Sequence, residues 1–136
     1  MPRLRNTLLI FAGLCLHAQD SASVRKFIGE WHARFKGKII CTIRLGSGDP
    51  ISGQTENCSI NVDANGDLRE PDSAGSGEPS PILNPKVQGS TLAFEEKDGD
   101  EVLKFEFTIV GDGKAELKIV SAPVVVKPIP FSREQG

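Results

Sequence analysis

Residues that carry out catalysis are scarce in this sequence. Among its 136 residues there is no tyrosine, one tryptophan, one methionine, two histidines and three cysteines. His17 falls in an N-terminal apolar stretch, which leaves His32 as the single histidine of the remaining chain. The Gly-x-Ser-x-Gly nucleophile elbow of α/β-hydrolases is also missing. With so few bases and metal ligands, the sequence predicts a protein that is not an enzyme and that has no cofactor and no metal site.

An excess of positive charge is missing as well. The chain has 16 Lys and Arg against 18 Asp and Glu, a net charge of −2. No basic stripe alternates with aromatic residues, which argues against a nucleic-acid-binding surface. Beyond the N-terminal stretch no apolar run is long enough to cross a membrane. The remaining length suits one domain, which we assign to residues 20–136.

The N-terminus has the pattern of a secretory signal peptide, assigned to residues 1–19. Arg3 and Arg5 precede the apolar run TLLIFAGLCL, and HAQDSAS then supplies small and polar residues before and after a cleavage point near residue 18 or 19. The run would span only about half of a ~30 Å hydrocarbon core, so a permanent membrane helix is not expected. Lipidation at Cys15, although Leu14 is large for the position before it, and a buried N-terminal helix stay open as alternatives. Export predicts a secreted or periplasmic protein.

The cysteine count supports this compartment. Cleavage would remove Cys15 and leave Cys41 and Cys58, and an even number of cysteines in an exported chain indicates a disulfide. A metal site built on this pair would need more ligands, and His32 is the one histidine left to supply them. We therefore predict a Cys41–Cys58 disulfide. It would close a loop of about 18 residues and contribute roughly 3 kcal/mol to stability.

The two cysteines also predict a hairpin. KIICTIRL and NCSINV both alternate apolar and polar residues, and they flank the turn-forming stretch GSGDPISG. Alternation puts Ile39 on the same inward face as Cys41. If the hairpin is centred between Asp49 and Pro50, Cys41 lies opposite Cys58, close enough for a bridge.

The remaining chain is predicted to be strands and turns. The meander STLAFEEKDGDEVLKFEFTIVGDGKAELKIVS carries two Asp-Gly turns, and its apolar residues alternate with charged ones. One dry and one wet face suit an all-β antiparallel barrel of seven or eight strands, or alternatively a small β-sandwich. The Pro/Gly/Ser-rich stretch at about residues 71–85 is expected to be one long loop. DANGD, residues 63–67, lacks the later ligands of a calcium loop and is expected to be a turn.

The opening strand carries a family resemblance. FIGEWHARF, Phe27–Phe35, resembles the start of calycin-type barrels, which include lipocalins, fatty-acid-binding proteins and avidins. Those barrels begin with a short helical turn and a Gly-x-Trp, here Gly29 to Trp31. In that superfamily an Arg or Lys near the end of the last strand often packs over the Trp and closes the barrel, and the resemblance implies this role for Arg133. The chain is also similar to small exported bacterial β-proteins with a Gly-x-Trp start.

Two functions from different classes follow from these observations. The first is a binding protein for a small, partly apolar ligand inside the barrel, because eight-stranded barrels hold either side chains or one small ligand. The second is a cell-envelope interaction module that presents a sheet face or the 71–85 loop to a protein or glycan. A monomer is expected. His32 alternates with Trp31 and is expected to point outward to solvent. The residues expected to line a ligand site are Phe35, Ile43, Phe94, Phe105 and Phe107.

Overall fold

The computed structural model describes residues 23–48, 50–71, 78–121 and 125–134, so the signal peptide expected at residues 1–19 lies outside the described residues. Within them the chain forms one helical turn at residues 23–25 and eleven strands. The strands are β1 (Gly29–Phe35), β2 (Lys38–Gly46), β3 (Ser52–Glu56), β4 (Asn61–Val62), β5 (Leu68–Arg69), β6 (Ser80–Pro81), β7 (Leu83–Gln88), β8 (Thr91–Asp98), β9 (Glu101–Gly111), β10 (Lys114–Ile119) and β11 (Ile129–Arg133).

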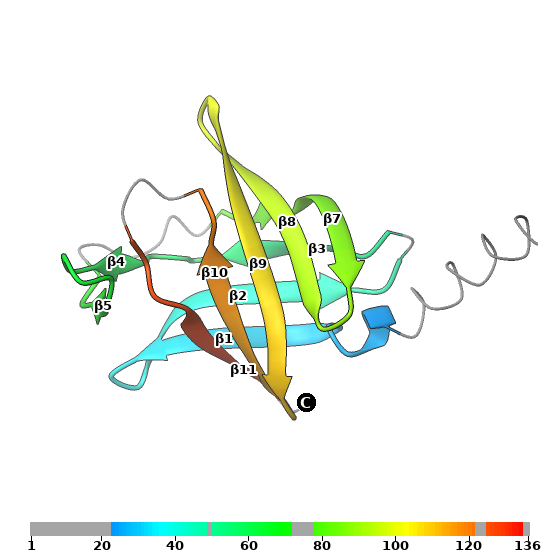
Figure 1. Ribbon diagram of the computed structural model, residues 1–136, viewed down its shortest axis with the longest axis horizontal. Helices are drawn as coiled ribbons and strands as arrows, with labels where there is room; N and C mark the ends of the chain where they lie inside the picture. The colour runs from blue at the N-terminus through cyan, green and yellow to red at the C-terminus, as the bar shows by residue number, and fades with distance from the viewer. Residues whose placement is uncertain (1–22, 49, 72–77, 122–124, 135–136) are drawn as a thin grey trace, which may run out of the picture.

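Nine of these strands form one antiparallel sheet that nearly closes into a barrel. The order is β6-β3-β2-β1-β11-β10-β9-β8-β7, and β4 and β5 form a separate pair. The first and last strands, β1 and β11, are neighbours in the sheet. Its two ends, β6 and β7, are consecutive in the chain and separated by Ile82 alone. In Figure 1 the β8–β10 part crosses in front of β1 and β2, as it must when a sheet curls on itself.

This topology confirms the all-β, up-and-down barrel. If β6 and β7 are counted as one strand bent at Ile82, the barrel has eight strands, and neighbouring strands follow one another in chain order. The separate pair β4 and β5 is not part of it. A β-sandwich would need two separate large sheets, whereas this chain builds a single one. The predicted Asp-Gly turns lie between β8 and β9 and between β9 and β10, where Gly99 and Gly113 have φ values of 64° and 65°.

One end of the barrel is filled by aromatic side chains. Trp31, Phe27 and Phe107 are fully buried, and Phe131 is 3 % exposed. The Trp31 and Phe107 rings meet edge to face with centroids 5.2 Å apart, and Phe107 meets Phe131 in the same way at 5.6 Å. The indole Nε1 of Trp31 donates a hydrogen bond to the Phe27 carbonyl oxygen at 2.9 Å, so the one polar atom of this cluster is satisfied.

The hairpin that carries the cysteines has a different register from the one predicted. Gly46 pairs with Ser52 and Thr42 pairs with Glu56, so each residue of β2 faces a residue one position earlier than the predicted hairpin requires. If this register continued, Cys41 would face Asn57 and not Cys58. Asn57 has a φ of 51°, and two residues later the Ser59 amide donates a hydrogen bond to the Ile40 carbonyl at 2.8 Å. Asn57 is thus an extra residue that shifts the pairing by one. This local shift brings Cys58 opposite Cys41. The predicted Cys41–Cys58 disulfide is confirmed.

A second irregularity corrects the predicted position of Ile39. Ala33 pairs with Cys41 but Arg34 pairs with Ile39, so Ile40 is an additional residue in β2. This bulge reverses the alternation on one side of it. Ile40 is therefore buried at 4 % exposure, whereas Ile39, expected to face inward, is 48 % exposed.

The prediction of one loop over residues 71–85 is wrong for its second part. Residues 72–77 lie outside the described residues, but the chain enters the sheet at Ser80 and continues as β6 and β7. Pro81 lies in the two-residue strand β6 at the end of the sheet. Pro85 lies where the β7–β8 register shifts, next to Asn84 with a φ of 50°. An edge position and a bulge are the places where a strand tolerates a residue without an amide hydrogen.

Candidate functional site

The end of the barrel near the helical turn is closed by the residues that the calycin resemblance indicated. Trp31 on β1 pairs with Arg133 on β11, and the Arg133 guanidinium carbon lies 5.2 Å from the Trp31 ring centroid. Arg133 Nη1 donates to the Lys26 carbonyl at 3.2 Å, and the Ile28 carbonyl lies 3.5 Å away. Gly29 allows this approach, because a Cβ there would lie 3.0 Å from Arg133 Cδ and its φ is 137°.

The opposite end of the barrel contains a cavity of about 460 Å³. Strands β2, β3, β4, β6, β8, β9 and β10 contribute residues to it, together with the segments that precede β4, β6 and β11. The partly buried apolar residues of its lining are Ile60, Val62, Leu103, Ile119 and Val126. This is the candidate site, which we call the barrel cavity.

The inner part of the barrel cavity is apolar. Phe94 on β8 and Phe105 on β9 are cross-strand partners, and their rings stack with centroids 5.1 Å apart and planes 20° from parallel. Leu117 and the Cys41–Cys58 disulfide also line the cavity. Because Cys41 belongs to β2 and Cys58 to the segment after β3, the disulfide links two parts of the cavity wall. The cavity therefore has an aromatic and sulfur-containing surface on which a hydrocarbon group can pack.

A buried carboxyl group stands beside this apolar surface. Glu96 follows Phe94 by two residues on β8, so strand alternation points both side chains into the barrel. Glu96 is 9 % exposed, and the Thr55 hydroxyl on β3 donates a hydrogen bond to its Oε2. Burial raises the pKa of Glu96 above its ordinary value, and the hydrogen bond from Thr55 opposes that shift only in part. This contact joins β3 to β8 across the nearly closed side of the barrel.

Two chain segments meet near the opening of the barrel cavity. In the turn between β4 and β5, the Asp63 side chain accepts hydrogen bonds from the Asn65 and Asp67 amides at 2.8 and 3.1 Å, which confirms the predicted turn. The Lys127 amide donates to the Gly66 carbonyl at 3.0 Å, and Lys127 Nζ lies 2.9 Å from Asp67 Oδ1. These contacts hold the β4–β5 turn against residues 125–127.

The structure separates the five residues that were expected to line a ligand site. Phe94 and Phe105 line the barrel cavity. Ile43 and Phe107 are fully buried in the packed core, and Phe35 is partly buried against that core, so these three do not contact the cavity. Apolar residues in neighbouring strands have the same pattern in the sequence whether they meet a packed core or a cavity.

Sequence reasoning missed the two buried polar residues of the barrel cavity, Glu96 and Thr55. Glu96 lies in EEKDGDE, whose charges indicate a solvated hairpin tip. The available signal was its even spacing from Leu92 and Phe94, which assigns Glu96 to the inner face. No comparable signal marks Thr55, which lies 41 positions away from Glu96 in the sequence.

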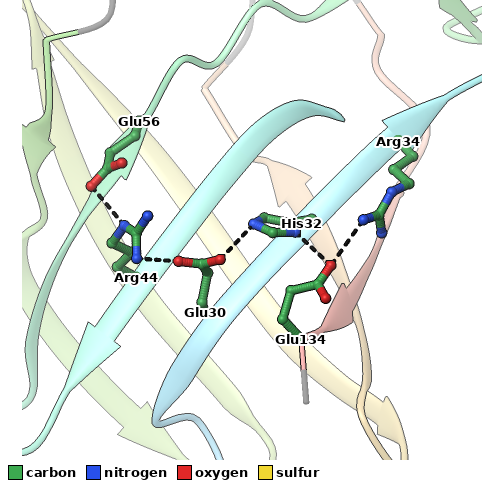
Figure 2. A network of polar contacts seen from close by, with 6 residues as sticks. All are labelled: Glu30, His32, Arg34, Arg44, Glu56 and Glu134. Carbon is green, nitrogen blue, oxygen red and sulfur yellow. Dashed lines mark hydrogen bonds and ion pairs between the residues drawn. The ribbon is translucent and has the colours of Figure 1, made fainter. Parts of the chain in front are cut away.

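A second group of polar side chains lies on the outer face of the barrel (Figure 2). We call it the outer network, and its members are Glu30, His32, Arg34, Arg44, Glu56 and Glu134. His32 Nε2 lies 3.0 Å from Glu30 Oε2, and His32 Nδ1 lies 2.7 Å from Glu134 Oε1. The outward direction expected for His32 is correct, but the expected solvent exposure is wrong, because carboxylates on both sides leave it 8 % exposed.

The outer network joins strands that are distant in the sequence. Arg44 on β2 contacts Glu30 on β1 and Glu56 on β3, and its Nε lies 2.9 Å from Glu56 Oε2. Arg34 lies 2.9 Å from Glu134 Oε1. The neighbouring Arg34 and His32 hold the pKa of Glu134 below its ordinary value. With its charges paired in this way, the outer network ties the first strands to the C-terminal end of the barrel.

The part of the chain that the structure describes contains no group of three or more His, Cys, Asp or Glu side chains able to hold a metal ion. Nor do the described ranges include a helix with the length and apolar character needed to span a membrane. Comparison of the chain with protein-family models, curated proteins and solved structures finds no match. The molecule is thus defined by its architecture, an all-β, nearly closed antiparallel barrel consistent with a calycin-like fold.

Proposed function

We propose that this protein is an exported, non-catalytic β-barrel protein that binds a small, partly apolar molecule in the barrel cavity. The observation that carries the proposal is the cavity itself. Its volume of about 460 Å³ lies within the range of small-molecule sites in proteins, roughly 300–1,000 Å³. An apolar inner surface with a few polar groups beside it is the usual composition of such sites.

The disulfide supports the exported location. Bonds of this kind form and persist in oxidising compartments, and Cys41–Cys58 joins two segments that both line the barrel cavity. The signal-peptide pattern at residues 1–19 agrees with it. A secreted or periplasmic protein of this kind would meet its ligand outside the cytoplasm.

The position of His32 supports binding rather than catalysis. It lies on the outer face, where both ring nitrogens contact carboxylates of the outer network. The polar pair beside the apolar surface of the cavity is Glu96 with Thr55, an arrangement that can orient a ligand by hydrogen bonding.

A dye-binding titration with a blocked-cavity variant tests the proposed function. Nile red, a neutral apolar dye, is titrated into the wild-type chain, Ile119→Trp and Ile39→Trp. Ile119 lines the barrel cavity, whereas Ile39 is 48 % exposed on the outside of β2, so the control makes the same substitution away from the cavity. We expect saturable binding to the wild type and Ile39→Trp, and its loss in Ile119→Trp. Equal binding by both variants, or none by the wild type, would refute a ligand site in the barrel.

Native mass spectrometry of the protein from the exported fraction of its own host gives a complementary result. A retained small molecule that dissociates on activation would identify the ligand directly. The same spectrum gives the cleavage site, the loss of two hydrogens that marks the disulfide, and the oligomeric state, for which a monomer is the expectation.

A further inference from the structure

The Glu96 carboxyl group is buried without a compensating positive charge. Its hydrogen-bond partner is the neutral Thr55 hydroxyl. Among the described residues no Lys, Arg or His forms an ion pair with Glu96. Burial raises its pKa because the charged form is poorly solvated there, which is the behaviour of a carboxylate that lacks a cation. A ligand that supplied a positive charge would remove this cost.

The surroundings of Glu96 specify the rest of such a ligand. Phe94 precedes it by two residues on the same inward face, and Phe94 stacks on Phe105. A cationic group beside the carboxylate would therefore be followed directly by aromatic surface. That surface binds a hydrocarbon or aromatic body, and its ring faces also attract a cation.

Most of the charged residues that line the cavity have the same sign as Glu96. Its lining includes the carboxylates of Glu78, Glu96 and Asp98 and one amine, that of Lys97. Lys97 is exposed and follows Glu96 on β8, so alternation directs it toward the opposite face. An excess of carboxylates favours the entry of cations and disfavours anions.

We infer that the barrel cavity selects small organic amines, in which an ammonium group pairs with Glu96 and an aromatic or branched apolar body packs on Phe94 and Phe105. This inference rests on the proposed function and adds the chemical class of the ligand. A charge-assisted hydrogen bond to a buried carboxylate is about twice as strong as a neutral one, so the charge of the ligand will decide its affinity.

Three probes of the same shape and different charge test this assignment. Phenylpropylamine, phenylpropanol and phenylpropanoate share one aromatic body and carry a positive, a neutral and a negative end group at neutral pH. Their binding is measured by isothermal titration calorimetry on the wild-type chain, Glu96→Gln and Glu116→Gln. Glutamine keeps the shape of the side chain and its hydrogen bond to Thr55. Glu116 is exposed on the outer face of β10, so its substitution changes the net charge equally without touching the cavity.

For the wild type we expect the amine to bind about tenfold more tightly than the alcohol, and the carboxylate to bind most weakly. Glu96→Gln should abolish the preference for the amine while the alcohol still binds, which shows that the cavity is intact. Glu116→Gln should retain the preference. A wild type that binds the alcohol as well as the amine would overturn the amine assignment and leave the proposed function standing, as would a preference that survives Glu96→Gln. Failure of all three probes to bind the wild type would overturn both.

Discussion

Replacement of Arg133 by alanine is the sharpest test of how the barrel is closed. The substitution removes the guanidinium group that lies over Trp31 and donates to the Lys26 carbonyl. The hydrogen bond from a charged donor contributes about 1.5 kcal/mol or more, and the 3.5 Å contact to the Ile28 carbonyl adds little at that length. A partly desolvated cation over an indole ring contributes about 1 kcal/mol. We therefore expect Arg133→Ala to lower the free energy of unfolding by about 2–4 kcal/mol.

Trp31 makes this effect measurable, because it is the one tryptophan in the chain and is fully buried. Urea unfolding followed by its fluorescence gives the change in stability. The emission of the native variant should shift to longer wavelength, since water gains access to the ring. Arg133→Met separates the two contributions, because it keeps the apolar stem and removes the charge. It should recover part of the loss.

The control is Arg25→Ala, which removes an exposed arginine from the neighbouring helical turn. Such a surface substitution should change stability by less than about 0.5 kcal/mol. If Arg133→Ala lies within the same limit and leaves the Trp31 emission unchanged, Arg133 does not hold this end of the barrel closed. If Arg133→Met is as stable as the wild type, packing of the stem accounts for the effect and the charge does not.

Three further predictions concern the disulfide and two carboxyl groups. Reduction of Cys41–Cys58, which are 17 positions apart, should lower the free energy of unfolding by about 3 kcal/mol, and the oxidised, denatured chain from residue 20 onward should contain no thiol that a labelling reagent detects. Burial raises the pKa of Glu96 in the folded protein, so as pH rises the group ionises in the unfolded chain before it ionises in the folded one. The free energy of unfolding therefore falls as pH rises from the ordinary pKa of 4.5 through the raised pKa. Glu96→Gln should therefore raise the melting temperature at neutral pH and match the wild type below 4.5, and a lower melting temperature at neutral pH would contradict this sign. The pKa of Glu134 is lowered from 4.5, so its stabilising effect is present above that value and is lost as pH falls through the lowered one. Glu134→Gln should lower the melting temperature at neutral pH but not in strong acid, and high salt should reduce the difference, whereas an effect independent of pH would show that charge is not its cause.

The elements of this fold that depend on local chemistry could be predicted from the sequence. The alternation of Leu103, Phe105 and Phe107 indicated which face of β9 is buried, since side chains alternate across any strand. The two Asp-Gly turns were predicted because glycine adopts the positive φ values that tight hairpins need. Each of these features is decided within a few residues.

The irregular positions in the strands could not be predicted. The extra residues at Ile40 and Asn57 each shift the pairing by one, and no local sequence pattern marks the residue at which a strand is interrupted in this way. The prolines between residues 71 and 85 indicated a loop, but part of this segment forms the two strands at the ends of the sheet. These two strands lie within residues 80–88, with Pro85 at a register shift.

The sequence by itself determined most of the strands and most of their inward faces, the cysteine pair, and the Trp31 and Arg133 positions in the first and last strands. Tertiary structure alone decided which inward residues pack together and which surround a cavity. Phe94 and Phe107 have the same pattern in the sequence, yet one lines the cavity and the other is buried in the core. The physical reason is that a cavity depends on how strands distant in the sequence approach one another as the barrel closes. The contact between Thr55 and Glu96, 41 positions apart, exists because that closure brings side chains of β3 and β8 within hydrogen-bond distance.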